Sequence, residues 1–316
     1  MNIVSVNIVT YNSRQYIKQC IECVYKQVYK KFSIVVIDNC SSDDTVSICK
    51  HFPLRIIQNS VNMGYAAAHN QGIGLTESKY VLTLNPDVFL RPKFLYQMVS
   101  VVEKDVHIGS ACGLLLRTDH VSESPKIIDG AGLFMRKNRR QGLLYEGKPI
   151  RLTPQANYIF GPDGSAAFYR RTMLEDVAIH KEIFDEDFFM HKEDVDLAWR
   201  AQRAGWESVF VPKAIAVHIR TFRSGKRQVV PPTIQRISLR NRYLLLLKND
   251  ELKYFLRDLQ HIMIYEFGIF CYVLFIERHS FHAYREVILL WHSMIQKRNY
   301  IHRVWPNGSQ AYKFFY

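Results

Sequence analysis

The first 84 residues alternate between short apolar runs rich in β-branched residues and stretches with a helical pattern. Buried strands of a parallel sheet read as continuous apolar runs, and the helices between them supply the crossover connections. The alternation therefore predicts an α/β fold with a doubly wound, mostly parallel sheet. Strands are expected at 3–10, 32–38, 54–58 and 80–84. Helices are expected at 13–29, from about residue 42 and at 65–75, and the second of them would have Ser41 or Ser42 as its N-cap.

Polar residues follow three of the predicted strands directly. Ligands of doubly wound sheets bind at the carboxyl ends of the strands, so these positions are candidates for binding. One such exit alone is usually only a turn, because Asn, Asp and Pro are common turn residues. Three exits at one edge favour a binding site, and they are the segments Thr10-Tyr11-Asn12, Asp38-Asn39 and Asn85-Pro86-Asp87.

Two familiar phosphate-binding motifs do not fit this sequence. Gly72 and Gly74 are followed by Glu77 where the dinucleotide fingerprint has its third glycine. The pair Gly225-Lys226 lacks the glycine five positions earlier that a P-loop requires. A nucleotide bound by this chain is therefore held in another way.

An acidic stretch at 184–200 contains Glu193, Asp194 and Asp196 just ahead of an amphipathic helix. Like charges this close repel and raise one another's pKa, so such clusters are common where a proton or a cation is handled. The alternative is a solvated helix N-terminus, where acids complement the helix dipole. The two interpretations stay open at this point.

Composition limits the class of protein. With 316 residues and 48% apolar content, the chain can form one large domain or one domain with an appendage. Six scattered cysteines form no disulfide framework, and the N-terminus shows no signal-peptide pattern, so we expect reduced thiols and a cytoplasmic location. The formal net charge is +13, and residues 217–316 contribute 16 Lys/Arg against 6 Asp/Glu, which is 16 − 6 = +10. A nucleic-acid partner is not expected, because no recognised binding motif accompanies this charge.

Residues 3 to about 220 resemble the inverting family 2 glycosyltransferases, in particular the rhamnosyltransferase-like members that build bacterial O-antigen and capsular polysaccharides. The resemblance implies a GT-A fold over residues 1–232, with a nucleotide-sugar half at 1–90 and an acceptor half at 91–232, followed by a basic helical region at 233–316. The matching segments are 8–13, 36–45, 62–73, 84–88, 164–171 and 184–200.

The resemblance also implies a site for a dTDP- or UDP-sugar. Asp38 would accept the imide N–H that uracil and thymine share. Asp87 and His218 would hold a divalent cation, Mg²⁺ or Mn²⁺, although Asn85 stands where the family's metal motif has its first acid. The full set of expected nucleotide-sugar contacts is Thr10, Tyr11, Asn12, Asp38, Asn39, Asn62, Gly64, Asn70, Asn85 and Asp87.

For catalysis, the resemblance implies that Asp194 is the general base, with Glu193 as the second choice. Inversion needs a carboxylate on the face opposite the leaving group, within reach of the acceptor hydroxyl. Asp196 should cap the helix or hold Arg200 at i+4. Asp163 and Gly164 are expected to contact the acceptor or the sugar. Trp199 and neighbouring aromatic residues could stack on sugar rings or belong to the core.

Past residue 233 the pattern is helical, with segments at 243–247, 252–264 and 287–295. The most apolar run, 262–276, is shorter than the roughly 20 residues needed to cross a bilayer. Basic residues beside these amphipathic helices predict a region that lies on an anionic membrane surface, at the inner face of the cell membrane. The alternative is a helical subdomain for packing or homodimerisation.

The function expected from the sequence is transfer of a sugar, L-rhamnose from dTDP-rhamnose, to a saccharide or lipid-linked acceptor. Two alternatives remain. The missing acid at Asn85 suggests a nucleotide-sugar binding protein without catalytic activity. The shared edge of uracil and thymine leaves a transferase that uses a UDP-sugar equally open.

Overall fold

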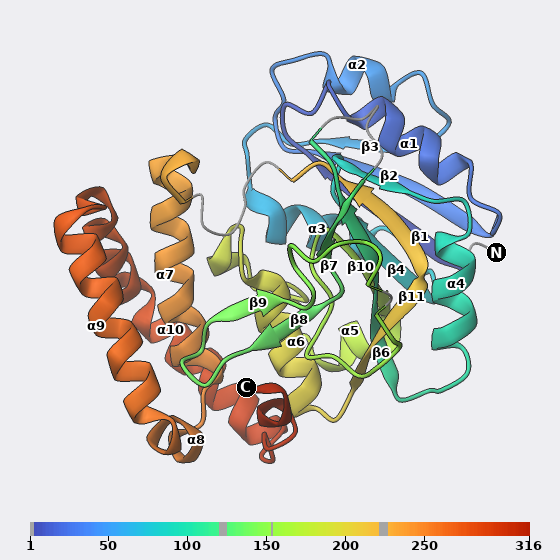
Figure 1. Ribbon diagram of the computed structural model, residues 1–316. Coiled ribbons are helices and arrows are strands. Elements are labelled where there is room, and N and C mark those ends of the chain that lie inside the picture. The colour runs from blue at the N-terminus through green and yellow to red at the C-terminus, as the bar shows by residue number, and fades with distance from the viewer. Residues whose placement is uncertain (1–2, 120–124, 153, 221–226) are drawn as a thin grey trace.

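The computed structural model describes residues 3–119, 125–152, 154–220 and 227–316 (Figure 1). Its first half is the predicted parallel sheet. Strands β1 (Val4–Thr10), β2 (Phe32–Asp38), β3 (Arg55–Gln58) and β4 (Tyr80–Leu84) are parallel, and each boundary lies within one residue of the prediction. The connecting helices are α1 (Ile17–Tyr25), α2 (Thr45–Cys49) and α3 (Gly64–Gly74).

The sheet continues past β4 with strands that run in both directions. Its order is β3-β2-β1-β4-β10-β6-β11-β5, and β7 pairs with β6. Strand β10 is antiparallel to β4 and β6, while β11 is parallel to β6 and antiparallel to β5. The bounds are β5 (Val88–Leu90), β6 (Ile108–Arg117), β7 (Ile127–Gly130), β10 (Ala166–Arg170) and β11 (Glu207–His218), with a separate hairpin of β8 (Leu133–Met135) and β9 (Gln141–Leu143).

Helices cover both faces of the sheet, which explains why its central strands are buried throughout. Val4, Val6 and Ile8 of β1 pack in the cluster that contains α1 and α4 (Phe94–Val102). Val9 points to the opposite face and packs with Ala68 of α3. Helices α5 (Arg171–Asp176) and α6 (Glu193–Arg203) extend the α3 side of the sheet. The predicted α/β class is therefore confirmed.

The predicted start of the second helix is wrong. Helix α2 begins at Thr45, and neither Ser41 nor Ser42 caps it. Both serines instead bond to neighbouring strand exits: Ser41 Oγ donates to Asp38 and Ser42 N donates to Asn12 Oδ1. The chain from 39 to 44 is consequently a loop at the binding edge, closed at its end by the Asp43 carboxylate, which accepts from Thr45 N.

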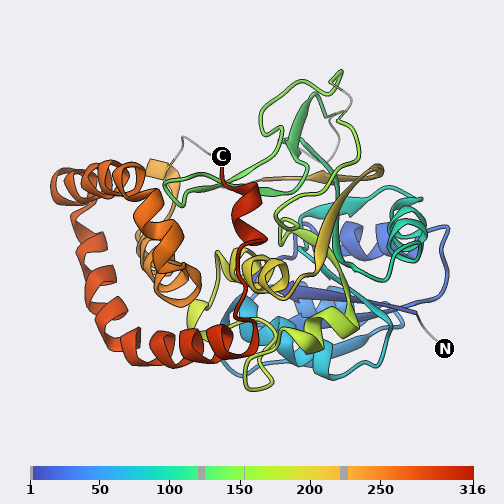
Figure 2. The same cartoon turned by 90° about the horizontal axis from the view of Figure 1, so that it is seen from below.

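The C-terminal region is helical, as predicted. The segments expected at 243–247 and 287–295 belong to longer helices, whereas the segment expected at 252–264 is divided at Asp258 between two helices. Figure 2 shows α7 (Pro232–Asn249), α8 (Leu252–Arg257), α9 (Leu259–Phe275) and α10 (His282–Val304) gathered beside the sheet. Trp199 of α6 joins them to the sheet, because its buried ring meets Tyr312 and Phe315 edge-on. Trp199 is thus a core residue. The short 3-10 helices lie at Glu186–Phe188, Arg227–Val229, Arg278–Phe281 and Ala311–Phe314.

Within the described ranges, no helix combines the length and the apolar character that a membrane crossing needs.

Candidate active site

A cavity of about 470 Å³ lies at the carboxyl edge of the central strands. Its acids and His218 come from the exit of β4, the loop before β10, the start of α6 and the end of β11, and Tyr65 of α3, the β8–β9 hairpin with Glu146, and Ser238 of α7 complete the lining. Asp87 and Asp194, more than a hundred positions apart in sequence, line this one cavity. Of the residues selected from the sequence, it contains Asn85, Asp87, Asp163, Gly164, Glu193, Asp194 and His218.

Asp194 is held by two backbone donors. Gly164 N donates to its Oδ2 at 2.9 Å and Val195 N donates to its Oδ1 at 2.8 Å. A Cβ at Gly164 would come within 3.2 Å of Oδ2, so glycine leaves the room that this carboxylate occupies. Burial and the charge of Asp163 raise the pKa of Asp194 to about 6. Its orientation is fixed, and it loses its proton close to neutral pH.

Glu193 lies beside Asp194 in a still less polar position. Its Oε2 is buried and accepts no hydrogen bond from the described residues. Burial and the neighbouring Asp194 raise the pKa of Glu193 to about 8. The two carboxyl groups therefore share one proton at neutral pH, which places a proton donor next to a proton acceptor.

A second part of the cavity wall contains Asn85, Asp87 and His218. His218 Nδ1 lies 2.8 Å from Asp129 Oδ2, and His218 Nε2 lies 3.5 Å from Asp87 Oδ1. Burial alone would lower the pKa of His218, but the hydrogen bond to Asp129 and the charge of Asp87 raise it to about 9. A cation at this wall would compete with the imidazole proton.

Arg220 connects Asp129, the partner of His218, with Asp163. Its Nε donates to Asp129 Oδ2 at 2.8 Å, and its Nη2 donates to Asp163 Oδ2 at 2.7 Å. Burial disfavours the charged guanidinium, but Asp163 and Asp129 together raise its pKa above the ordinary value. A positive charge is therefore fixed between Asp129 and Asp163. Two basic residues that follow in the sequence, Arg223 and Lys226, lie outside the described residues.

The sequence analysis missed Asp129 and the bridging role of Arg220. Asp129 is fully buried in β7, and its partners are 89 and 91 positions away. One sequence signal was available: an acid within the apolar run Ile127-Ile128-Asp129-Gly130 must find a partner, since a buried carboxylate is costly alone.

Three side chains of this wall offer donors for a hard cation. The Oδ1 atoms of Asn85 and Asp87 are buried and accept no hydrogen bond from the described residues. His218 receives support at Nδ1 from a carboxylate, the arrangement common in metal-ligating histidines. Only Asp87 is anionic, and the described chain contains no group of three or more His, Cys, Asp or Glu side chains placed to hold a metal. These residues fit a hard cation that also takes oxygen ligands from a bound molecule.

The predicted nucleotide residues of β1 and β2 form a separate polar group at the same edge of the sheet. Asp38 is buried, and it accepts hydrogen bonds from Thr10 Oγ1 at 3.0 Å and from Ser41 N at 2.9 Å. Asn39 donates to Gly64 O, while Tyr11 is 54% exposed at the rim. Asn12 takes a positive φ of 51°, which turns its amide toward Ser42. None of these residues lines the cavity of Asp87.

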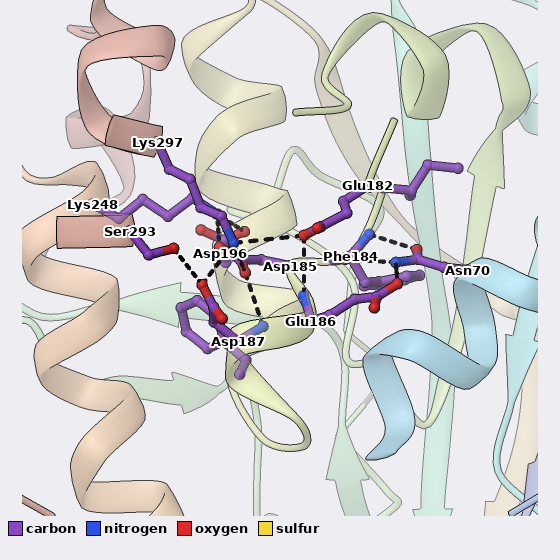
Figure 3. A network of polar contacts seen from close by, with 12 residues as sticks. Asn70, Glu182, Phe184, Asp185, Glu186, Asp187, Asp196, Lys248, Ser293 and Lys297 are labelled. Atoms are coloured by element: carbon purple, nitrogen blue, oxygen red, sulfur yellow. Dashed lines mark hydrogen bonds and ion pairs between the residues drawn. The ribbon is translucent and has the colours of Figure 1, made fainter. Parts of the chain in front are cut away.

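Gly64 and Asn70 hold the acidic segment in place. Gly64 has φ 86°, and a Cβ there would lie 2.6 Å from Phe189 O, which accepts from Tyr65 N at 2.6 Å. The close approach that glycine permits is thus to the protein's own backbone. Asn70 exchanges hydrogen bonds with the backbone of Phe184 (Figure 3). Asn62 Oδ1 accepts from Gly64 N. Ligand contact by Asn62, Gly64 and Asn70 stays a prediction.

A buried network of ion pairs attaches the C-terminal helices to the same segment (Figure 3). Lys248 of α7 donates to Asp185 at 2.6 Å and to Asp196 at 2.9 Å. Lys297 of α10 donates to Asp187 at 2.8 Å and also contacts Asp185. The expected i+4 pair of Asp196 with Arg200 is confirmed, at 3.0 Å. These acids hold the structure together and do not enter the cavity of Asp194.

Asn241 of α7 adds a second attachment. Its Nδ2 donates to the carbonyl oxygens of Phe188, Met190 and His191, at 2.8, 2.8 and 2.7 Å. The segment that leads into Asp194 is therefore held from the C-terminal side by side chains of α7 and by Lys297 of α10.

The curled α/β sheet with acids at its carboxyl edge defines a GT-A type transferase, and comparison with known proteins gives the family. The model of glycosyl transferase family 2 matches residues 5–178, and the chain belongs to this family. Similar solved structures include Staphylococcus aureus TarS 1-349, with a TM-score of 0.55 and 17% identity over 99% of this chain and 89% of that one. The mannosyltransferase PcManGT from Pyrobaculum calidifontis, solved with GDP-Man and Mn²⁺, has a TM-score of 0.56 and 14% identity over 96% and 85%.

Among curated proteins, the chain is 27% identical to the N-acetylglucosaminyl-diphospho-decaprenol L-rhamnosyltransferase of Mycobacterium tuberculosis over 242 residues, which are 69% of this chain and 76% of that protein. It is also 27% identical to the amylovoran biosynthesis glycosyltransferase AmsB of Erwinia amylovora, over 71% of each chain. The predicted family is thus confirmed.

Proposed function

We propose that this glycosyltransferase works with inversion and that Asp194 is its general base. The supporting observation is one cavity that is lined both by a carboxylate fixed by two backbone donors and by Asp87, His218 and Asn85. A base in this position takes the proton of the acceptor hydroxyl as its oxygen attacks the anomeric carbon. Glu193 keeps a proton at neutral pH and so leaves the negative charge on Asp194.

The leaving nucleoside diphosphate is proposed to lie against Asp87, His218 and Arg220. Arg220 supplies positive charge, and Asp129 holds both Arg220 and His218 in place. Asp87, His218 and Asn85 would hold the divalent cation, Mg²⁺ or Mn²⁺, which when bound neutralises diphosphate charge. The Mn²⁺ in the related mannosyltransferase structure supports this assignment.

The nucleotide is proposed to lie over the exits of β1 and β2, with the base near Asp38 and the exposed Tyr11. Asp38 is already oriented by Thr10 and Ser41, so it presents a fixed acceptor. Contacts from Asn12, Asn39, Asn62, Gly64 and Asn70 belong to the same proposal.

We propose dTDP-L-rhamnose as the donor and a saccharide or lipid-linked saccharide of a cell-surface polysaccharide as the acceptor. The supporting observation is the 27% identity with a rhamnosyltransferase whose acceptor is a diphospho-decaprenol saccharide. In this proposal residues 1–232 carry the reaction, with the acceptor near Asp163 and Gly164. Residues 233–316 bring the active site to the inner face of the cell membrane.

The test is transfer from labelled dTDP-rhamnose, UDP-sugars and GDP-sugars by the full chain, with Mg²⁺, with Mn²⁺ and with a chelator. We expect turnover of dTDP-rhamnose that a chelator reduces and Mn²⁺ restores. Preference for a UDP-sugar would overturn the rhamnose assignment but leave the mechanism. Calorimetric binding of a nucleotide sugar without transfer to any acceptor would favour the binding protein that Asn85 suggests.

A further inference from the structure

A second, larger cavity opens beside the first. It has a volume of about 1260 Å³ and lies between the tip of the β8–β9 hairpin and helices α7 and α9. The hairpin extends from the sheet toward these helices in Figure 1. Gln141, Lys192 and Ser238 line both cavities, so the two adjoin along these side chains. A molecule at Asp194 that passes these three side chains would enter the second cavity.

The two cavities differ in charge. The first is lined by five acidic residues, Asp87, Glu146, Asp163, Glu193 and Asp194, together with Lys192, His218 and Arg220. Among the described residues that line the second there is no Asp or Glu, and there are six Lys or Arg side chains. Arg227 and Arg242 are neutralised by Glu277 and Glu266.

Three cations at the hairpin tip, Arg136, Lys137 and Arg140, form no ion pair with any residue in the described part of the chain, and all three are exposed. Lys192 is likewise not in an ion pair, and its Nζ lies 3.4 Å from Ser238 Oγ at the junction of the two cavities. Unpaired cations on several sides of one cavity are the arrangement that binds an anion such as a phosphate.

The far wall of the second cavity is apolar. Helix α9 contributes Ile264, Ile269 and Val273 to it, together with the rings of Tyr265 and Tyr272. The outer surface of the same helix exposes further large apolar residues, among them Phe267 at 70% and Phe275 at 69%, and Leu289 on α10 is 72% exposed. Glu266, the one acid in α9, is bound to Arg242 and Tyr243. An apolar chain leaving the cavity would therefore find an uncharged path along α9.

We propose that the second cavity binds the phosphate or diphosphate of an amphiphilic acceptor, whose sugar reaches Asp194 and whose apolar chain lies along α9. This inference rests on the proposed function, because it names the acceptor of the same reaction. The anion lies among Arg136, Lys137, Arg140 and Lys192. A second copy of this chain matches the surface poorly, because residues 217–316 carry a net charge of +10 and like charges would face one another.

The test uses geranylgeranyl diphosphate as the probe, with the full chain and an excess of dTDP to fill the nucleotide site. We expect micromolar binding by calorimetry. The triple substitution Arg136→Ala, Lys137→Ala and Arg140→Ala should weaken it at least tenfold. A matched triple of exposed lysines elsewhere, Lys18→Ala, Lys50→Ala and Lys104→Ala, should leave it within twofold. Equal binding by both triples, or no binding by the unmodified chain, overturns the proposal.

Further arms separate the sources of the interaction. Inorganic diphosphate tests the anion alone, and we expect it to bind more weakly than the probe. Phosphatidylglycerol vesicles test a general membrane surface. If the variant with the hairpin triple substitution no longer binds the vesicles but still binds geranylgeranyl diphosphate, the proposal is overturned. A dimer in sedimentation that Phe267→Asp splits would also overturn it, since a second copy would then cover α9.

Two controls keep the result interpretable. A thermal shift with dTDP reports whether the triple variant is folded, and the single exposed substitution Arg136→Glu provides a milder variant with the same expected direction. The binding assay involves no turnover, so its failure is distinguishable from failure of the transferase proposal, which Asp194→Asn tests by transfer.

Discussion

Two groups of acids lie within residues 185–196, and they meet opposite surroundings. Asp185 and Asp196 are buried against Lys248, Lys297 and Arg200, and the nearby cations lower both pKa values although burial opposes this. Glu193 and Asp194 form no ion pair with any described residue, and burial raises both pKa values.

The comparison shows that partners from distant helices, and not the acids themselves, divide this segment into a structural and a reactive part. The paired acids stabilise the fold in their charged form. The two unpaired acids repel each other when both are charged, and such raised pKa values are typical of residues that take part in a reaction.

The largest expected effect is on the reactive acids. Asp194→Asn should lower the transfer rate by about 100- to 10,000-fold, the usual contribution of a general base, because an amide cannot accept the proton. Transfer assays measure the rate, and thermal unfolding should show an unchanged or slightly raised Tm. Glu193→Gln is the matched control and should cost less. Full activity in the Asp194 variant would contradict the assignment.

Among the paired acids, Lys248→Met should lower the free energy of unfolding by about 3–5 kcal/mol, because it leaves Asp185 and Asp196 buried with too little positive charge. Chemical denaturation measures this. Lys79→Met removes the exposed pair with Glu103 at 3.3 Å and should cost no more than about 1 kcal/mol. Similar losses of unfolding free energy in the two variants would show that the buried network stabilises the fold no more than an exposed ion pair does.

The pH dependence separates the two groups without a substitution. The pKa of Asp194 is raised to about 6, so the base is lost as the pH falls through that value. The kcat/KM should then drop about tenfold per pH unit below 6. The structural pairs persist, because their lowered pKa values keep Asp185 and Asp196 charged. Near-UV circular dichroism at each pH should stay native down to pH 5, and a rate independent of pH from 7 to 5 would argue against Asp194 as the base.

The smallest effect is expected at the rim of the network. Ser293→Ala removes a single hydrogen bond to Asp187 Oδ2 of 2.7 Å, and Asp187 keeps its contact with Lys297. The free energy of unfolding should fall by about 0.5–1.5 kcal/mol, with transfer unaffected. A loss as large as that of Lys248→Met would place the centre of the network at α10 instead of α7.

The local sequence pattern was enough to predict the first four strands, because a buried parallel strand consists of a continuous run of apolar residues. It could not give the antiparallel pairings of β10 and of β5 with β11, which depend on partners far along the chain. The same limit applies to the site. Glu193, Asp194, Asp163 and Asp87 share a cavity as expected. Asp129 was not predicted, because its role depends on contacts with His218 and Arg220, which are distant in the sequence.

The three hydrogen bonds from Asn241 carry a practical consequence for engineering. Exchange of residues 233–316 for the helices of a relative is an obvious way to alter acceptor preference in a chimaera. Such an exchange would also remove the supports of the segment preceding Asp194, unless an asparagine and a lysine are retained at positions 241 and 248. Grafts that keep this pair and redesign only the outer surface of α9 should recover active chimaeras more often than whole-region swaps.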